Sequence, residues 1–335
     1  MAGIIAGCEN WILTEVLMHH LVIKLPRLCV VNILLLTVSL ALFSGCRAGH
    51  QAHSNLQLDH SHSDSTAPIE NQDWAKQRLA KSPRHQEWVN VKYKPANANA
   101  EREVSAFVVY PEVKTKTTSV LVIHEIFGMS DWVQSLTDQL AEAGYIAIAP
   151  DLLSGMGPNK GGTSDVATAG SNAIGTAIRE LPPDQITADL NAVADYVAAL
   201  PSANGKLAVA GFCWGGGQAF RFATNRPSLK ASFVFYGAPP MTGPQDNQVI
   251  DKAALARISC PVYGFYAEND MRINATLPAT IEAMKGLKKT YEPVTYAGAG
   301  HGFMRAGEDP NDKNPANKKA REDAWKRWRE ILAKL

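Results

Sequence analysis

The chain has almost no excess charge of either sign. Its 33 lysines and arginines oppose 32 aspartates and glutamates, which gives a formal net charge of +1. This balance gives no argument for nucleic acid or another strongly charged partner, and we expect neither. The 335 residues contain no repeat with a period of about 20–50 residues, which argues against solenoids and propellers. A chain of this length has room for one large α/β domain or two smaller ones.

Cysteine is also scarce. Of five cysteines, Cys8, Cys29 and Cys46 lie near the N-terminus, and only Cys213 and Cys260 fall in the rest of the chain. This distribution does not form a disulfide framework. We therefore expect Cys213 and Cys260 to be free thiols, with Cys260 packed at the start of an apolar strand pattern.

No apolar run here is long enough for a spanning helix, but a shorter one occupies residues 28–43. A membrane span needs about 18–20 such residues. Lys24 and Arg27 precede the run, and small residues follow it at 44–46. A positive region, a short apolar core and a small-residue end are typical of a secretory signal. We expect residues 1–45 to be a signal peptide and the body to be exported.

The end of that segment, FSGC at 43–46, resembles a bacterial lipobox, whose cysteine becomes the lipidated first residue of the mature chain. Lipidation of Cys46 would hold the protein at a membrane surface, in the periplasm or on the cell exterior. A plain signal peptide, an uncleaved anchor and a fortuitous apolar segment are the alternatives. Met18 is an alternative start to Met1, because the stretch before Met18 is long for a signal.

A polar segment separates the signal from the body. Residues 47–67 are rich in His, Ser, Asp and Gln, and we expect 46–85 to form a linker that buries too little apolar surface to fold. Histidine-rich tracts can bind metal, but these histidines have no fixed spacing, and a solvated linker is the favoured interpretation. They are His50, His53, His60 and His62. We expect no metal and no organic cofactor.

The body, residues 86–335, alternates strand and helix patterns. Residues 151–181 are rich in Gly, Ser and Thr, and are expected to form either a mobile loop or short helices over the site. The first two strands form an antiparallel hairpin, and the rest predict a mostly parallel sheet with helices on both faces, a three-layer α/β fold. Strands are expected at 88–93, 103–110, 119–124, 145–149, 206–210, 231–236, 261–267 and 291–296, and helices at 130–143, 184–200, 276–287 and 315–335.

The motif GFCWGG at 211–216 carries the strongest functional signal. It follows an apolar strand pattern and precedes a helix pattern, as in the nucleophile elbow of the α/β-hydrolases. Gly211 and Gly215 flank Cys213 where a Cβ would obstruct the tight turn. A buried packing cysteine is the alternative interpretation of Cys213. The strand pattern before Cys213 and the helix pattern after it favour a cysteine nucleophile.

A thiol needs a base, and the base needs a carboxylate to orient it. In α/β-hydrolases the order along the chain is nucleophile, acid, histidine. Asp270 follows the 261–267 strand and His301 follows the last strand, so both fit that order. Glu268 is the competing acid. We therefore expect a triad of Cys213, Asp270 and His301.

Two backbone amides are candidates for the oxyanion hole. One belongs to Trp214, the residue after the nucleophile, and the other lies in the loop after an early strand. The second candidate is Ile126, within HEIFG at 124–128.

Three motifs together resemble the dienelactone hydrolase family: GFCWGG at 211–216, EIFG at 125–128 and GHGF at 300–303. The resemblance covers roughly residues 88–335. It implies an α/β-hydrolase fold and a Cys-Asp-His triad that cleaves a small ester or lactone through an acyl-enzyme, without a cofactor. We expect a monomer.

The resemblance also implies roles for charged residues. A glutamate at the position of Glu125 approaches the resting thiol, and an arginine at the position of Arg305 helps to hold a substrate carboxylate. Arg272, two residues after Asp270, is a further candidate for pairing with Glu125 and for binding substrate. Arg179 is a candidate for the family's other substrate-binding arginine.

Other functions use the same pattern. An acyltransferase would share the triad but transfer the acyl group to an alcohol in place of water. A thioesterase would share the triad but take the acyl group from a thioester in place of an ester. A non-catalytic surface lipoprotein would keep the fold and lose the activity. The complete set of triad residues argues against the last of these.

Overall fold

A computed structural model describes residues 72–96 and 100–335 of the chain. The predicted signal peptide, Cys46 and most of the predicted linker lie outside the described residues. Among the residues that are described, no helix combines the length and apolarity needed to cross a membrane.

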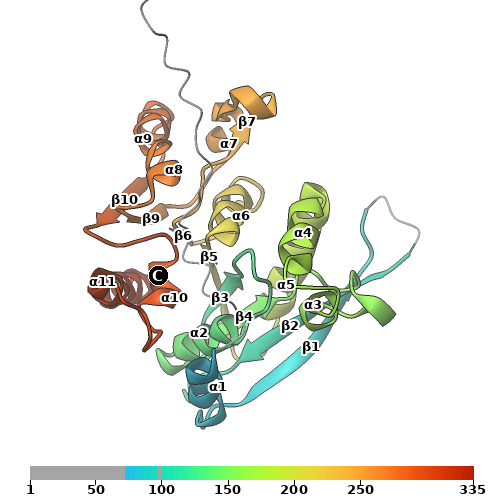
Figure 1. Cartoon of the computed structure of the whole chain (residues 1–335). Coiled ribbons are helices and arrows are strands. Elements are labelled where there is room, and N and C mark those ends of the chain that lie inside the picture. Colours follow the sequence, from blue (N-terminus) through green and yellow to red (C-terminus); the bar gives the residue numbers. More distant parts are fainter. Residues whose placement is uncertain (1–71, 97–99) are drawn as a thin grey trace, which may run out of the picture. The chain divides into compact units, whose positions relative to one another are not determined.

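The body contains an eight-stranded sheet in the order β1-β2-β4-β3-β5-β6-β9-β10 (Figure 1). β1 pairs antiparallel with β2, and β2 pairs antiparallel with β4; all other neighbours are parallel. This confirms the predicted fold class. The strands are β1 (Gln86–Tyr93), β2 (Arg102–Val109), β3 (Thr117–Ile123), β4 (Ile146–Pro150), β5 (Ala203–Phe212), β6 (Ala231–Phe235), β9 (Val262–Ala267) and β10 (Tyr291–Tyr296).

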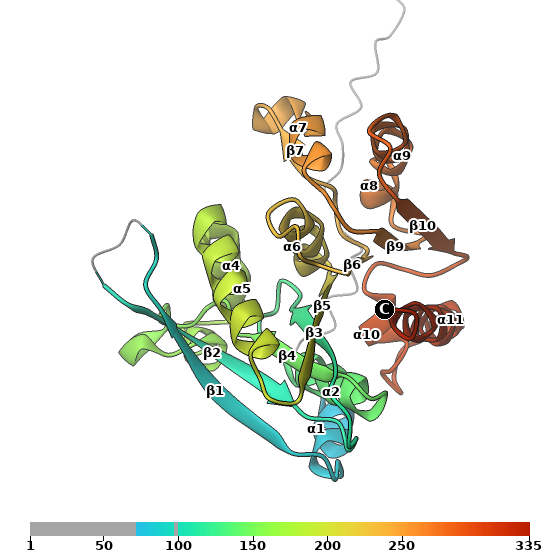
Figure 2. The ribbon, with the colours of Figure 1, turned by 180° about the vertical axis from the view of Figure 1, so that it is seen from behind.

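Helices cover both faces of the sheet (Figures 1 and 2). One face packs against α4 (Ala173–Glu180), α5 (Pro183–Ala198), α6 (Trp214–Ala223), α7 (Lys252–Ala256) and α9 (Leu277–Gly286). The other face packs against α1 (Asp73–Ala80), α2 (Asp131–Glu142), α10 (Phe303–Ala306) and α11 (Pro315–Leu332). The sheet is thus the middle of three layers.

The central strand β3 shows why these residues form such a sheet. Val120, Leu121, Val122 and Ile123 are fully buried. Successive strand side chains point to opposite faces, so Val120 and Val122 join the core under α2, while Leu121 and Ile123 join the core under α5 and α6. An uninterrupted apolar run is therefore what a strand covered on both faces requires.

The folded body begins before the position that the sequence pattern predicted. Helix α1 lies inside the segment expected to be linker, and Ala75 is fully buried there. The side-chain oxygen of Gln72 accepts a hydrogen bond of 2.7 Å from the Trp132 amide, at the start of α2. Only one residue of α1 is buried. Its pattern is therefore mostly polar and resembles that of a solvated tether.

The segment 151–181 forms short helices, the second of the two predicted alternatives. They are η2 (Pro158–Lys160), α3 (Thr163–Ala167) and α4. Several other small elements were not predicted: β7 (Met241–Thr242), η3 (Gln245–Asn247), β8 (Val249–Ile250), α7, α8 (Met271–Asn274) and α10. They are too short to produce a clear periodic pattern.

Candidate active site

Cys213 sits in a strained turn between β5 and α6, with φ +56° and ψ −120°. A side chain other than glycine rarely adopts this conformation, and such strain is typical of functional sites. The flanking glycines are required by close backbone contacts. A Cβ at Gly211 would lie 1.9 Å from the Gly215 carbonyl oxygen, and a Cβ at Gly215 would lie 2.3 Å from the His124 carbonyl oxygen.

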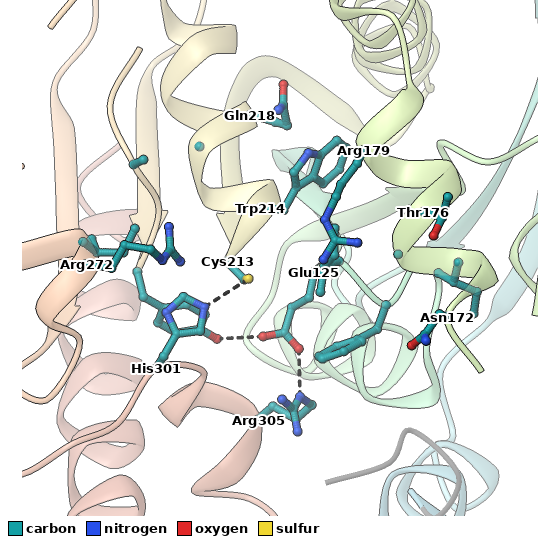
Figure 3. Close-up of a pocket in the computed structure, with 18 of the residues that line it drawn as sticks. Glu125, Asn172, Thr176, Arg179, Cys213, Trp214, Gln218, Arg272, His301 and Arg305 are labelled. Carbon is teal, nitrogen blue, oxygen red and sulfur yellow. Dashed lines mark hydrogen bonds and ion pairs between the residues drawn. The ribbon is translucent and has the colours of Figure 1, made fainter. Parts of the chain in front are cut away.

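Cys213, His301 and Asp270 form one hydrogen-bonded chain. The His301 Nε2 atom lies 3.0 Å from Cys213 Sγ, a contact drawn in Figure 3. Its Nδ1 atom lies 2.5 Å from Asp270 Oδ2. The other oxygen of Asp270 accepts a 3.3 Å hydrogen bond from the Ile273 amide and so caps α8. The carboxylate is therefore held by two elements.

Distant loops meet to build this chain. Cys213 follows β5, Asp270 follows β9 and His301 follows β10, so all three lie at the carboxyl edge of the parallel strands. This edge is where ligands bind in open α/β sheets. The Asn269 amide donates a 2.9 Å hydrogen bond to the Ala299 carbonyl, which ties the loop of Asp270 to the loop of His301.

The surroundings of His301 favour its charged form. Burial opposes a charge on the imidazole, but hydrogen bonds with Asp270 and Cys213 outweigh this and raise the pKa of His301 to about 10. The Tyr236 ring meets the imidazole edge-on, with the centroids 5.0 Å apart. Tyr236 was not singled out from the sequence. It directly follows β6 with φ +40°, and no sequence motif marks it.

Glu125 is paired with Arg305 in this structure. Its Oε2 atom accepts a 2.8 Å hydrogen bond from Arg305 Nε, and the two side chains are 2% and 11% exposed. Burial opposes the charge on Arg305, but Glu125 outweighs it and raises the pKa of the guanidinium. The guanidinium also lies over the Phe127 ring, 5.1 Å from its centroid. Arg305, which was expected to hold a substrate carboxylate, thus makes the contact with Glu125 for which Arg272 was a candidate.

A pocket of about 1410 Å³ opens over Cys213 and His301. Arg272 and Arg179 line it and lie on either side of Cys213 in Figure 3. Within the described part of the chain, neither arginine forms an ion pair. Apolar wall residues include Ile126, Phe127, Trp214, Ala238, Pro239 and Pro240. The pocket therefore combines apolar walls with available positive charge.

The two candidate oxyanion amides lie at this pocket. Ile126 and Trp214 both line it, and neither amide donates a hydrogen bond to another described residue. Trp214 is the first residue of α6, where an amide has no acceptor within the helix. Both amides are therefore available to a ligand oxygen.

Cys260 is buried and lies outside the pocket, whereas Cys213 lines it. Both are free thiols, as predicted. Cys260 is buried in the core beneath α7 and α9, and burial raises the pKa of its thiol to about 11. The described residues contain no group of His, Cys, Asp and Glu side chains suited to a metal ion.

A mostly parallel eight-stranded sheet, with Cys213 at the strained turn after β5 and His301 after the last strand, is the architecture of the α/β-hydrolases. The sequence profile of the dienelactone hydrolase family matches residues 104–335, and the chain belongs to this family. It is a dienelactone hydrolase-like hydrolase.

Individual relatives agree with this assignment. A candidate carboxymethylenebutenolidase from Saccharolobus solfataricus is 32% identical over 268 residues, which cover 70% of this chain and 95% of the relative. A protein of the same description from Escherichia coli K12 is 32% identical over 219 residues, covering 62% and 73% of the two chains. The crystal structure of a candidate dienelactone hydrolase from Klebsiella pneumoniae matches with a TM-score of 0.61 and 25% identity, covering 75% of this chain and 99% of that one.

Proposed function

We propose that the chain hydrolyses small carboxylic esters or lactones that carry an anionic group, with Cys213 as the nucleophile. The observation that carries this proposal is the unbroken contact from Cys213 Sγ through His301 to Asp270, with distances of 3.0 and 2.5 Å. The contact opens into a pocket, and its residues follow the order expected of an α/β-hydrolase.

The reaction proceeds in two halves. Cys213 Sγ attacks the carbonyl carbon while His301 Nε2 holds the proton, and the amides of Trp214 and Ile126 bind the resulting oxyanion. Collapse breaks the C–O bond, and His301 protonates the leaving alkoxide, which leaves a thioester on Cys213. His301 then removes a proton from water, water attacks the thioester, and the acid departs as the thiol is restored. Asp270 holds the imidazole tautomer throughout.

Glu125 regulates the thiol in this proposal. When paired with Arg305, as in this structure, its carboxylate is held away from Cys213. When released, the carboxylate accepts a hydrogen bond from the Cys213 thiol, which keeps its proton, so the resting cysteine is then neutral. Tyr236 assists the paired state, because its hydroxyl lies 3.5 Å from Glu125 Oε1.

Positive side chains select the substrate. Arg272 and Arg179 line the pocket without an ion pair among the described residues, so an anionic group on the substrate finds a partner there. Arg305 joins them when Glu125 moves. Guanidinium groups bind carboxylates in a bidentate geometry that lysine does not offer.

A panel of chromogenic esters and lactones tests the mechanism. We expect Cys213→Ala to abolish turnover without changing the circular dichroism spectrum. Cys260→Ala is the matched control, because it removes the buried thiol in the core and should leave turnover near the wild-type rate. Full activity of Cys213→Ala would refute the mechanism. Trapping the thioester by mass spectrometry after acid quench identifies the acylated residue.

Product analysis separates hydrolysis from acyl transfer. With a competing alcohol present, a hydrolase releases mainly the free acid, whereas an acyltransferase releases mainly the new ester. We expect the acid.

We also propose that the mature chain begins at a lipidated Cys46 and works outside the cytoplasm at a membrane surface. The support is the signal-like sequence of residues 24–46. Mass spectrometry of the mature N-terminus tests the proposal. Cys46→Ala is the control: without the lipidated cysteine, the protein should no longer be found in the membrane fraction. An unprocessed residue 1, or an unmodified Cys46, contradicts it.

A further inference from the structure

His124 is a buried side chain to which the mechanism above gives no role. It directly follows β3, and none of its surface is exposed. Its imidazole contacts three segments around the site: the backbone of Glu125, the indole of Trp214 and the loop after β4. Two of these segments carry the proposed oxyanion amides.

The hydrogen bonds of His124 define its tautomer. Its Nδ1 atom lies 2.8 Å from the Glu125 carbonyl oxygen, which only accepts, so Nδ1 carries the proton. Its Nε2 atom accepts from the Leu152 amide at 3.4 Å. Burial lowers the pKa of His124, although the charge of Asp151 opposes this. The ring is therefore neutral, with one donor and one acceptor in use.

The bond to Glu125 acts on the peptide group that contains the Ile126 amide. A trans peptide is planar, so the carbonyl of one residue and the N–H of the next point in opposite directions. Fixing the carbonyl of Glu125 thus fixes the direction of the Ile126 N–H. The Gly128 amide donates to the same carbonyl at 3.2 Å. A carbonyl that accepts hydrogen bonds also makes its own peptide N–H a stronger donor.

The other oxyanion amide lies against the same imidazole. The rings of His124 and Trp214 are stacked, with the centroids 5.6 Å apart and the planes at 16°. The backbone of His124 also supports the next residue of the elbow, because a Cβ at Gly215 would lie 2.3 Å from the His124 carbonyl oxygen. One residue thus contacts both chain segments that supply a proposed donor.

We propose that His124 is a positioning residue that holds the Ile126 and Trp214 amides in the direction required by the oxyanion. The inference rests on the proposed function, because the oxyanion exists only if an ester or lactone acylates Cys213. His124 does not line the pocket, so it acts through the two peptide groups and not on the substrate.

Two reactions of the same thiol test this role. Acylation of Cys213 by p-nitrophenyl acetate forms an oxyanion, whereas alkylation by iodoacetamide is a displacement at a saturated carbon and forms none. His124→Phe keeps an aromatic ring beside Trp214 and removes both hydrogen bonds. Removing one oxyanion donor in other enzymes costs about 10²–10³ in rate. Since His124→Phe misdirects a donor without deleting it, we expect acylation to slow by about 10- to 100-fold, with alkylation within about twofold of wild type.

Rescue distinguishes positioning from simple packing. His124→Asn carries an amide N–H near the position of Nδ1 and should recover part of the acylation rate, although it lacks the aromatic ring. Wild-type acylation in His124→Phe overturns the proposal. A parallel loss of acylation and alkylation also overturns it, because that pattern reports damage to the Cys213–His301 pair. If His124→Phe does not fold, His124→Ala provides the same ratio of the two rates.

Failure of the proposed function has a different signature. If ester turnover survives Cys213→Ala, the acyl-enzyme mechanism is wrong. If turnover depends on Cys213 but His124→Phe acylates at the wild-type rate, the mechanism stands and only the role of His124 is wrong.

Discussion

Replacing Arg305 with methionine removes one half of a buried ion pair. The side chains of Glu125 and Arg305 are 2% and 11% exposed, and 2.8 Å separates Oε2 from Nε. Methionine has a comparable length and no charge, so the Glu125 carboxylate stays buried without its cation. Breaking such a pair from one side costs about 3–5 kcal/mol. We expect the free energy of unfolding of Arg305→Met to fall by that amount at neutral pH.

A double variant separates the buried charge from the loss of packing. Glu125→Gln combined with Arg305→Met leaves no unpaired charge, so it should be more stable than Arg305→Met alone. Both variants lose the contact between the guanidinium and the Phe127 ring, and this loss cancels in the comparison. The side-chain amide introduced by Glu125→Gln would still accept from Tyr236, whose hydroxyl lies 3.5 Å from Glu125 Oε1.

Equilibrium urea unfolding, followed by circular dichroism, measures these differences. Lys319→Met is the control, because Lys319 and Asp323 form an exposed ion pair at 2.7 Å on α11. Exposed pairs contribute little to stability, so this variant should unfold like wild type. If Arg305→Met is no less stable than Lys319→Met, the buried pair does not have the expected effect on stability. If the double variant is as unstable as Arg305→Met, the unpaired buried charge is not the cause of the loss.

Three further predictions concern the elbow, the histidine and the core. Gly215→Ala should unfold or inactivate the chain, whereas Gly217→Ala, whose Cβ would meet its nearest neighbour at 3.4 Å, should remain folded and active; equal behaviour of the two contradicts the argument. Between pH 6.5 and about 10 the folded chain keeps a proton on His301 that the unfolded chain releases, so the free energy of unfolding should fall as pH rises through this window. Asp270→Asn removes the carboxylate charge that helps to raise this pKa, and urea unfolding at several pH values should show a shallower slope; an unchanged slope would show that His301 is not responsible. Trp328→Ala empties a fully buried position and should cost about 3–5 kcal/mol in the same assay, and a cost below about 1 kcal/mol would contradict the packing seen here.

Most of the sheet was predictable because its signals are local. The apolar run of β3 and the GFCWGG motif each lie within a few residues, and hydrophobic runs and glycines at fixed offsets need no distant partner to be recognised. The order of Cys213, Asp270 and His301 along the chain was equally informative, because parallel strands bring their carboxyl ends to one edge. The structure brings these three residues together at 3.0 and 2.5 Å.

Other features had no local signal. Helix α1 buries one residue, so its pattern resembled the polar linker beside it. Tyr236 follows an ordinary buried strand, and only its position beside His301 and Glu125 gives it significance. His124 is an ordinary end-of-strand residue in the sequence, and its two hydrogen bonds and its stacked neighbour are visible only in three dimensions.

The sequence alone thus determined the α/β sheet and a candidate nucleophile at the elbow, together with a candidate histidine and acid in the order expected of an α/β-hydrolase. These features follow from periodicity and from the steric demands of one tight turn. Only the tertiary structure decided which arginine meets Glu125. From the sequence, Arg272 was the candidate for this contact and Arg305 was expected to bind substrate, yet Arg305 makes the ion pair from 180 positions away. That choice depends on how α8 and α10 pack at the sheet edge, where contacts between distant segments fix a side chain's partner and local sequence does not.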